Sequence, residues 1–289
     1  MIKIENVEVM GLEAAIRGMR NPMNSWEKSD SYENYCVDYE KDENTGEVAE
    51  IRVPYYRVGA GDLALMKKLA NAGTDHRKFM RMITVYLDIT APLYWWKEFD
   101  TYKVGTVANS CSTMHKIADK EFTLEDFSRD HIDGGKVCAK RGDEMFSSWD
   151  ILKLTIDALN YHREQYLETV NHSRPHGKTE YRAEIAKYHW WQMIQLLPSS
   201  YNQRRTVMLN YEVLANIYKA RHNHKLDEWH DFCKWIENLP YSELITGRND
   251  KKLKITSYDD NAGPIIPDLT PEQGEELTDA MSLIREENE

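Results

Sequence analysis

The sequence has no long hydrophobic run, no closely spaced cysteine pair and no excess of basic residues. Its longest apolar stretches are far shorter than the roughly 20 residues that cross a bilayer. The opening residues, MIKIENVEVM, do not look like a signal peptide. We therefore expect a cytoplasmic protein that does not contact membranes. The four cysteines match no zinc-binding spacing and are expected to be reduced thiols.

The net charge of −11 excludes a general affinity for polymeric nucleic acid, which requires a basic face. A small anionic ligand is compatible with this charge, because a few Arg and Lys side chains can hold one locally. Aromatic residues are plentiful, with 8 Trp and 17 Tyr. Side chains of this size fill cores and line clefts. The pairs Trp95-Trp96 and Trp190-Trp191 lie in apolar runs, so we expect both to be buried.

The first third of the chain predicts short strands and helices. Residues 1–10 alternate like a strand that leads into a helix at 11–20. Residues 38–53 look like a hairpin around Asn44-Thr45-Gly46. Asp62 is expected to cap a helix over 63–73, which Gly73 ends.

The middle of the chain predicts a strand over 80–90 and a helix over 91–103 with Pro92 in its first turn. Residues 104–116 show no clear period. The charged segment 116–146 is expected to be a surface insertion.

Two long helices are expected next, over 149–170 with Ser148 as the cap and over 179–197 before Pro198. A strand over 201–210 and a helix over 211–239 follow. We expect one domain over 1–256 and a flexible acidic tail over 257–289.

Three groups of residues offer chemistry. The histidines His222, His224 and His230 have side chains suited to zinc, but residues two apart on a helix face different ways, so a structural role is favoured. Cys111 is either a thiol nucleophile or an inert cysteine.

The third group carries amide and guanidinium donors that suit a flavin, a ribose or a phosphate: Asn210, Asn216 and Arg221. Helix capping by Asn210 and a surface ion pair of Arg221 are the simpler interpretations, and the chemistry of the residues alone favours them.

Two stretches, 88–114 and 209–229, resemble the flavin-dependent thymidylate synthases. That family has an Ala-Pro pair, then Gln-x-x-Arg-His-Arg, then Ser-x-Asn-Glu-x-Ser-x-Arg. Ala91-Pro92 match the first pair, and Glu98 stands at the Gln. The remaining signature positions are occupied in order by Thr101, Tyr102, Lys103, Thr106, Asn109, Cys111 and Thr113.

The second stretch is closer to the family pattern. It keeps residues that the family has in the same order, namely Asn210, Leu214, Asn216, Arg221, His224 and Trp229. Glu212 replaces a family Arg, and His76 resembles the His of a Gly-His-x-Ser/Thr segment.

The resemblance implies an α+β fold with a central antiparallel or mixed sheet and long helices. It implies a homotetramer that binds FAD between subunits through His76, Lys103, Asn210 and Asn216. The substrate would be deoxyuridylate, with methylene-tetrahydrofolate as the carbon source and NADPH as the reductant.

The resemblance also assigns roles to individual residues, and none of them is a metal ligand. The catalytic residues would be Arg221, Cys111 and Glu98. The substrate-binding residues would be Arg221, Asn109 and Thr113.

The departures from the family motif weaken phosphate binding. Thr101, Thr113 and Glu212 stand where the family has Arg, and each lost charged contact is worth roughly 1.5–3 kcal/mol. Substitute charge is available from Lys103, Arg204 and Arg205. A catalytically inactive relative that binds a nucleotide or a protein partner is therefore the alternative function. A metal-dependent hydrolase using the 222–230 histidines is a distant third.

Overall fold

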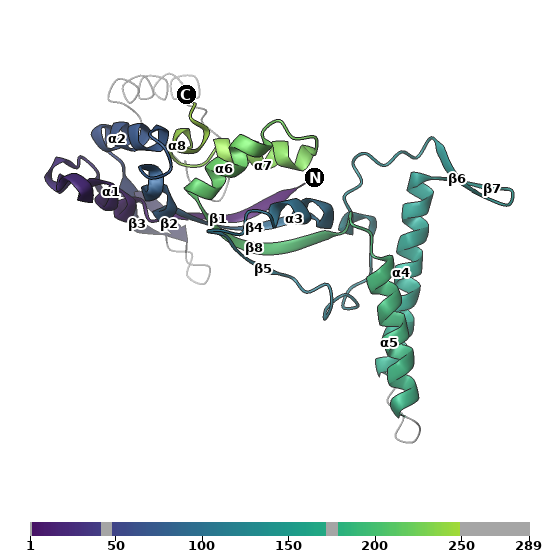
Figure 1. Cartoon of the computed structure of the whole chain (residues 1–289). Coiled ribbons are helices and arrows are strands. Elements are labelled where there is room, and N and C mark those ends of the chain that lie inside the picture. Colours follow the sequence, from purple (N-terminus) through teal and green to yellow (C-terminus); the bar gives the residue numbers. More distant parts are fainter. Residues whose placement is uncertain (1, 42–47, 172–178, 249–289) are drawn as a thin grey trace, which may run out of the picture. The chain divides into compact units, whose positions relative to one another are not determined.

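The computed structural model describes residues 2–41, 48–171 and 179–248. The chain forms two compact units, which are considered separately below (Figure 1). Unit 1 comprises Met1–Val9 and Thr84–Trp235, and unit 2 comprises Met10–Ile83 and Ile236–Glu289. The predicted tail over 257–289 and the predicted turn at Asn44-Thr45-Gly46 lie outside the described residues.

Unit 1 is built on a four-stranded sheet of order β1-β4-β8-β5. Its strands are β1 (Lys3–Met10), β4 (Thr84–Pro92), β5 (Val107–Ser110) and β8 (Asn202–Asn210). The central pair β4 and β8 is antiparallel, from Thr84 opposite Asn210 to Pro92 opposite Asn202. The predicted combination of helices with an antiparallel sheet is thus confirmed.

Two predictions about the strands differ from the structure. β4 begins at Thr84 rather than at residue 80, because Arg77–Met82 form a 3₁₀ helix, η3. β5 lies in the segment for which no element was predicted. All four of its residues are exposed, so it has no alternation of buried and exposed positions that a sequence pattern would reveal.

One face of the sheet forms the core of unit 1. Alternate β4 residues Val85, Leu87 and Ile89 are buried on this face. It is covered by α3 (Leu93–Phe99), α6 (Tyr211–Arg221) and α7 (Asp227–Glu237), as Figure 1 shows. Trp95 and Trp96 are fully buried there, as predicted, and Trp96 donates its indole N–H to the carbonyl of Gln203 at 2.9 Å.

The long helices α4 (Ser148–Asn171) and α5 (Thr179–Leu196) pack as an antiparallel hairpin. Ser147, not the predicted Ser148, caps α4, because the Ser147 hydroxyl accepts from the Asp150 N–H while the Asp150 carboxylate accepts from the Ser147 N–H. The second tryptophan pair was predicted to be buried. This is wrong for Trp191, which is 42% exposed.

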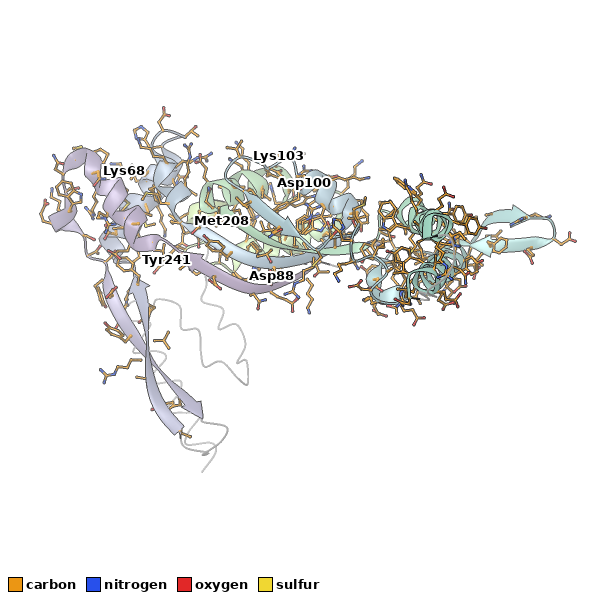
Figure 2. All side chains as sticks on the ribbon, turned by 90° about the horizontal axis from the view of Figure 1, so that it is seen from below. Lys68, Asp88, Asp100, Lys103, Met208 and Tyr241 are labelled. Carbon is orange, nitrogen blue, oxygen red and sulfur yellow. The ribbon has the colours of Figure 1, made fainter. Side chains whose placement is uncertain are left out.

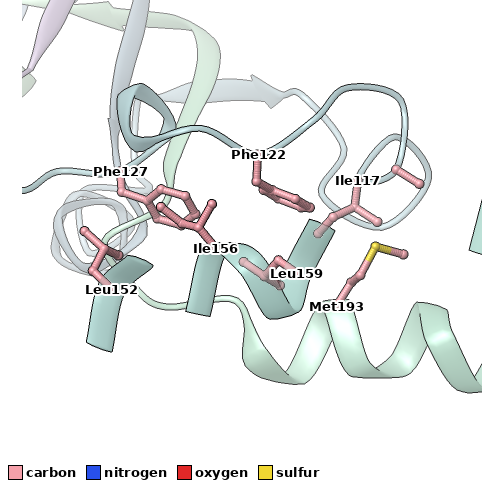
Figure 3. Packing of buried hydrophobic residues seen from close by; sticks show 8 residues of the cluster. Ile117, Phe122, Phe127, Leu152, Ile156, Leu159 and Met193 are labelled. Atoms are coloured by element: carbon pink, nitrogen blue, oxygen red, sulfur yellow. The ribbon is translucent and has the colours of Figure 1, made fainter. Parts of the chain in front are cut away.

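The segment that precedes the hairpin contributes to its core, although its charge predicted a surface position. It contains η4 (Leu124–Asp126) and the hairpin of β6 (Val137–Arg141) and β7 (Glu144–Ser147). Figure 3 shows how its apolar side chains pack against the two helices. The buried cluster consists of Ile117, Ala118, Phe122, Phe127, Leu152, Ile156, Leu159 and Met193.

Unit 2 joins short helices to a two-stranded hairpin. Its helices are α1 (Leu12–Arg20), η1 (Asn21–Met23), η2 (Trp26–Lys28), α2 (Ala60–Asn71), η3 and α8 (Glu243–Thr246). Its strands β2 (Tyr32–Lys41) and β3 (Val48–Arg57) pair antiparallel, as predicted, and Figure 2 shows them as a narrow ribbon.

A buried ion pair holds unit 2 together. Arg20 lies 2.6 Å from Asp62, and Asp62 is fully buried. Asp62 also accepts from Ser29 and Ser31, both at 2.6 Å. These bonds and the pairing with Arg20 lower the pKa of Asp62 although its burial acts to raise it. The prediction that Asp62 caps α2 is therefore wrong.

The capping role belongs to Asp30, a residue distant in sequence. Its carboxylate accepts from the N–H of Gly61 at 2.7 Å and from the N–H of Asp62 at 2.9 Å, inside the first turn of α2. A Cβ on Gly59 would lie 2.2 Å from the Asp30 Cγ, so this approach requires glycine. The end of α2 is close to the prediction, at Asn71, with Gly73 at φ +103°.

We expect Asp62→Ala to lower the free energy of unfolding by about 3–5 kcal/mol, because it leaves the Arg20 guanidinium buried without its carboxylate. Urea denaturation followed by circular dichroism measures this change. Glu13→Ala is the matched control, since it breaks the exposed pair with Arg17 in the same unit and should change the value by less than about 1 kcal/mol. Equal effects of the two substitutions would contradict the assigned role of Asp62.

Candidate functional site

The candidate site lies where the C-terminal ends of α3 and α6 approach each other on the covered face of the sheet. α3 follows β4 at Pro92, and α6 follows β8 at Asn210. Pro92 is the residue before the helix rather than part of its first turn, which corrects the prediction. The site residues come from α3, the following loop 100–106, β5 and the residues just after it, α6, and the chain from α6 into α7.

Asn210 is fixed at the start of α6. Its side-chain oxygen accepts from the N–H of Val213 at 3.0 Å, which caps the helix. Gly105, at φ +79°, packs against the other side of the amide, where a Cβ would lie 2.9 Å from the Asn210 Nδ2. The amide nitrogen therefore faces the 103–106 loop, whereas the oxygen is committed to the helix.

Glu98 and Arg221 form the centre of the site. The Arg221 Nη1 lies 2.7 Å from the Glu98 carboxylate, and the Arg221 side chain is 18% exposed. The same carboxylate oxygen accepts from the indole N–H of Trp229 at 3.1 Å and lies 3.3 Å from the Nε2 of His224. Three side chains, from the end of α6, the loop that follows it and the start of α7, thus converge on one carboxylate from α3.

Aromatic rings complete the surroundings of Arg221. Its guanidinium carbon lies 4.9 Å from the ring centre of Trp229 and 5.6 Å from that of Tyr102. Its Nε also donates to the Tyr102 hydroxyl at 2.9 Å. The structure therefore shows the capping Asn210 and the ion-paired Arg221 of the simpler interpretation, and their ligand-binding roles remain predictions.

The three histidines of 222–230 have separate partners. The helix predicted over 211–239 is interrupted, because α6 ends at Arg221 and α7 begins at Asp227. His222 stacks on Tyr218 with ring centres 5.5 Å apart, and His230 lies 3.6 Å from Asp227. Since His224 contacts Glu98, the three imidazoles do not converge on one point.

The other predicted site residues of unit 1 are more open. Lys103, Asn109, Cys111 and Asn216 are exposed, and Thr113 is half-buried. The Cys111 N–H donates to the carbonyl of Arg204 at 2.9 Å, which extends the edge of the sheet beyond β5. Figure 2 shows Lys103 and Asp100 in the region that follows α3. His76 belongs to unit 2, where it is exposed just before η3.

The Thr106 hydroxyl is buried and has no hydrogen-bond partner among the described residues. Thr106 follows Gly105, which packs against Asn210, so the unsatisfied oxygen belongs to the same loop. A buried hydroxyl without a partner is uncommon in folded proteins.

Sequence reasoning missed a polar network on the uncovered face of the sheet. Asp88 accepts from the Thr206 hydroxyl, from Arg204 at 2.7 Å and from Asn6 at 2.7 Å. These hydrogen bonds, with that of Thr206 first, hold the pKa of Asp88 well below its usual range. The alternation of apolar and polar residues along β4 places Asp88 on the polar face of the sheet. This alternation is the sequence signal that could have identified the network.

A second missed cluster joins α3 to α7. The Tyr94 hydroxyl hydrogen-bonds to the buried Glu228 carboxylate and lies 3.0 Å from the Ser128 hydroxyl. Burial, together with the neighbouring carboxylate, raises the pKa of Tyr94 to about 12. The phenol is therefore a neutral donor near pH 7, and it stabilises the packing of the two helices that carry the site.

Comparison with solved structures finds this fold in thymidylate synthase X (ThyX) from Helicobacter pylori, solved with FAD and dUMP. The TM-score is 0.50 at 14% identity, and the match covers 85% of this chain and 97% of the other. A second flavin-dependent ThyX structure from H. pylori, complexed with FAD and dUMP, has a TM-score of 0.49 at 15% identity, with 84% and 97% covered.

A UMP/dUMP methylase, PolB from Streptomyces cacaoi, bound with 5-Br dUMP, has a TM-score of 0.47 at 13% identity, with 86% and 95% covered. No protein-family description and no curated protein sequence matches the chain. At this identity the likeness to the first ThyX structure shows that the fold is shared.

None of the described helices has the length and apolarity that a membrane span needs.

We expect Glu98→Ala to lower the free energy of unfolding by about 1–3 kcal/mol, because three donors lose their shared acceptor. The fluorescence of Trp229 should change as well, since its indole N–H loses this partner. Urea denaturation monitored by fluorescence gives both values. Asp119→Ala, which breaks the exposed pair with Lys116, should leave both nearly unchanged. A change as small as that of the control would show that Glu98 does not organise the site.

Proposed function

We propose that the chain is a flavin-dependent enzyme that methylates, or otherwise substitutes, carbon 5 of deoxyuridylate. The observation that carries the proposal is the fold shared with a ThyX whose structure holds FAD and dUMP, over 97% of that chain. The motif resemblance over 88–114 and 209–229 supports the same function independently. Both stretches contribute residues to the candidate site, at the C-terminal ends of α3 and α6.

The residues of the 103–106 loop and of α6 have the chemistry that FAD requires. The Asn210 amide nitrogen faces this loop. Lys103 adds a cation for the phosphates, and the exposed Asn216 adds a second amide. His76 is the fourth proposed cofactor-binding residue. When bound, the flavin would supply the reducing equivalents.

The remaining site residues act on the nucleotide by position and charge. Arg221 and Lys103 supply positive charge for the phosphate, while Asn109 and Thr113 offer hydrogen bonds. Glu98 orients Arg221 through the 2.7 Å ion pair, so we assign it a positioning role. Cys111 is exposed at the sheet edge, where its thiol is accessible.

The proposal includes finer points that rest on the resemblance. Methylene-tetrahydrofolate would provide the carbon and NADPH the reductant. The assembly would be a homotetramer in the cytoplasm. We infer binding of a single nucleotide rather than of polymeric nucleic acid, because the net charge of −11 disfavours a long phosphate backbone.

A specific observation favours the second candidate function, a catalytically inactive relative that binds a nucleotide or a protein partner. The Arg221 guanidinium already bonds to Glu98 and Tyr102 and lies against Trp229. A phosphate must compete with this carboxylate for the cation. If the ion pair between Arg221 and Glu98 persists in the presence of nucleotide, the protein keeps the fold of the family without its catalytic activity.

The purified protein should bind FAD with a perturbed flavin spectrum, and dUMP should then raise the melting temperature further. Tritium release from 5-³H-dUMP, measured with methylene-tetrahydrofolate and NADPH, separates the two candidates. Release above that of a protein-free control identifies the enzyme. Binding of dUMP without tritium release identifies the inactive relative. Protein that takes up no FAD in the titration contradicts the proposed enzyme.

We expect Arg221→Ala to weaken dUMP binding at least about 10-fold, because a charged hydrogen bond to the phosphate is lost. FAD binding should be unchanged. Isothermal titration with each ligand measures both affinities.

Arg129→Ala is the matched control, because Arg129 also pairs with a carboxylate, that of Glu125 at 2.8 Å, but is not among the candidate site residues. It should affect dUMP less than Arg221→Ala does. Equal loss of FAD and dUMP in Arg221→Ala would mean that its nucleotide role is misplaced.

A further inference from the structure

Residues 21–31, which connect α1 to β2, form a loop that buries none of its own side chains. The loop contains η1 and η2, and each of its residues is exposed or half-buried. Met23 is 81% exposed and Trp26 is 49% exposed. We call this segment the Trp26 loop. Because it adds no buried side chain to the core, hydrophobic burial does not explain what fixes its shape.

The buried ion pair of Arg20 and Asp62 fixes the Trp26 loop instead. Arg20 donates to the carbonyl of Ser25 at 3.2 Å and to the carbonyl of Lys28 at 3.0 Å. Asp62 accepts from two serine hydroxyls at the end of the loop. Burying an ion pair carries a desolvation cost. Among the described residues, each side-chain hydrogen bond that this pair makes to a third residue goes to the Trp26 loop. The scaffold thus holds an exposed loop in place, as it does for loops that carry binding residues.

Within this loop the indole of Trp26 has a fixed orientation. Its N–H donates to the side-chain oxygen of Asn21 at 2.7 Å, and the backbone carbonyl of Asn21 accepts from the N–H of Asn24 at 3.1 Å. Trp26 is nevertheless the most exposed of the eight tryptophans. A large side chain held in one orientation loses rotamer freedom, and here burial does not compensate for that loss. This combination is typical of a preorganised contact surface.

We propose that Trp26 is a stacking platform for a fused heteroaromatic ring, the kind of ring that purine nucleotides and folates carry. An indole face stacks on flat heterocycles of different kinds, because each of them has a π face. A fused two-ring heterocycle matches the indole in area, since the indole is itself a two-ring system. The net charge of −11 disfavours a polymeric nucleic acid as the source of the ring.

Asn21 supplies a second contact at the edge of the platform. Its side-chain oxygen is occupied by the Trp26 indole. Its amide nitrogen has no acceptor among the residues that the structure describes, and it carries two donor hydrogens. A ring nitrogen or carbonyl oxygen at the edge of the stacked heterocycle can accept one of them. Purines and pterins both carry such acceptors, so the two contacts recognise the chemistry that these ligands share.

The inference goes beyond the proposed function and does not depend on it. The residues that carry it, from Arg20 to Asp62, all belong to unit 2, whereas Glu98 and Arg221 belong to unit 1. The two sites are therefore tested by different variants. A chain that takes up no FAD but binds a purine nucleotide or a folate through Trp26 contradicts the proposed enzyme and supports the platform.

Isothermal titration of the full chain with AMP and with folate tests the proposal. At least one of these probes should bind, and Trp26→Ala should weaken its binding about 5- to 100-fold because the stacked ring is lost. Trp26→Phe keeps an aromatic face and should bind more tightly than Trp26→Ala. Asn21→Ala should weaken binding about 2- to 10-fold. Both side chains are exposed, so circular dichroism should show an unchanged fold.

Trp191→Ala is the control, because Trp191 is the other exposed tryptophan, at 42%, and lies on α5. It should leave the affinity unchanged. Trp26-dependent binding of AMP alone identifies a purine nucleotide as the ligand, binding of folate alone identifies a pterin, and binding of both identifies the shared fused ring. A native chain that binds neither probe overturns the proposal, as does a Trp26→Ala variant with native affinity. Equal losses in Trp26→Phe and Trp26→Ala would refute stacking as the mode of binding.

Discussion

The antiparallel register of β4 and β8 is the constraint on which the candidate site depends. Pro92 lies opposite Asn202 and Thr84 opposite Asn210, so α3 and α6 begin at opposite ends of a nine-residue ladder. That ladder is about 30 Å long. α3 and α6, about 10 and 16 Å long, run back over the same face and together nearly span it. Their C-terminal ends therefore meet, and they bring Glu98 to Arg221.

Because the two helices meet here, the side chains that hold α3 against α6 are also the charged groups of the candidate site. The C-terminal end of a helix carries a partial negative charge, which favours the cationic Arg221 in the last turn of α6. The Glu98 carboxylate neutralises the charge of the guanidinium from the facing end of α3. The ring centres of Tyr102 and Trp229 lie 5.6 and 4.9 Å from the guanidinium carbon of Arg221. The resemblance places a glutamine at position 98, and a glutamate there holds Arg221 more tightly because it is charged. An anionic ligand must therefore bind Arg221 more strongly than the Glu98 carboxylate does.

Local sequence patterns predicted those parts of the fold that depend on local rules. The alternation along β4 and the burial of Trp95-Trp96 follow from residue type and period, and the structure confirms both. Asp62 has a sequence position that suits a cap, yet its charge is taken by Arg20, which is 42 residues away in sequence. The cap comes instead from Asp30, and no local rule identifies so distant an acceptor. For the same reason the convergence on Glu98 was not predicted.

The exposed Trp191 shows a different limit of sequence reasoning. An apolar period on a helix indicates that a face is buried, but it does not indicate which molecule buries it. α4 and α5 each have two apolar faces, and the 117–127 segment covers one face of the pair. The other apolar face is exposed to water, and exposed apolar patches of this kind mark interaction surfaces. The burial predicted for Trp191 therefore does not hold, because this side chain lies on the face of the hairpin that the 117–127 segment leaves exposed.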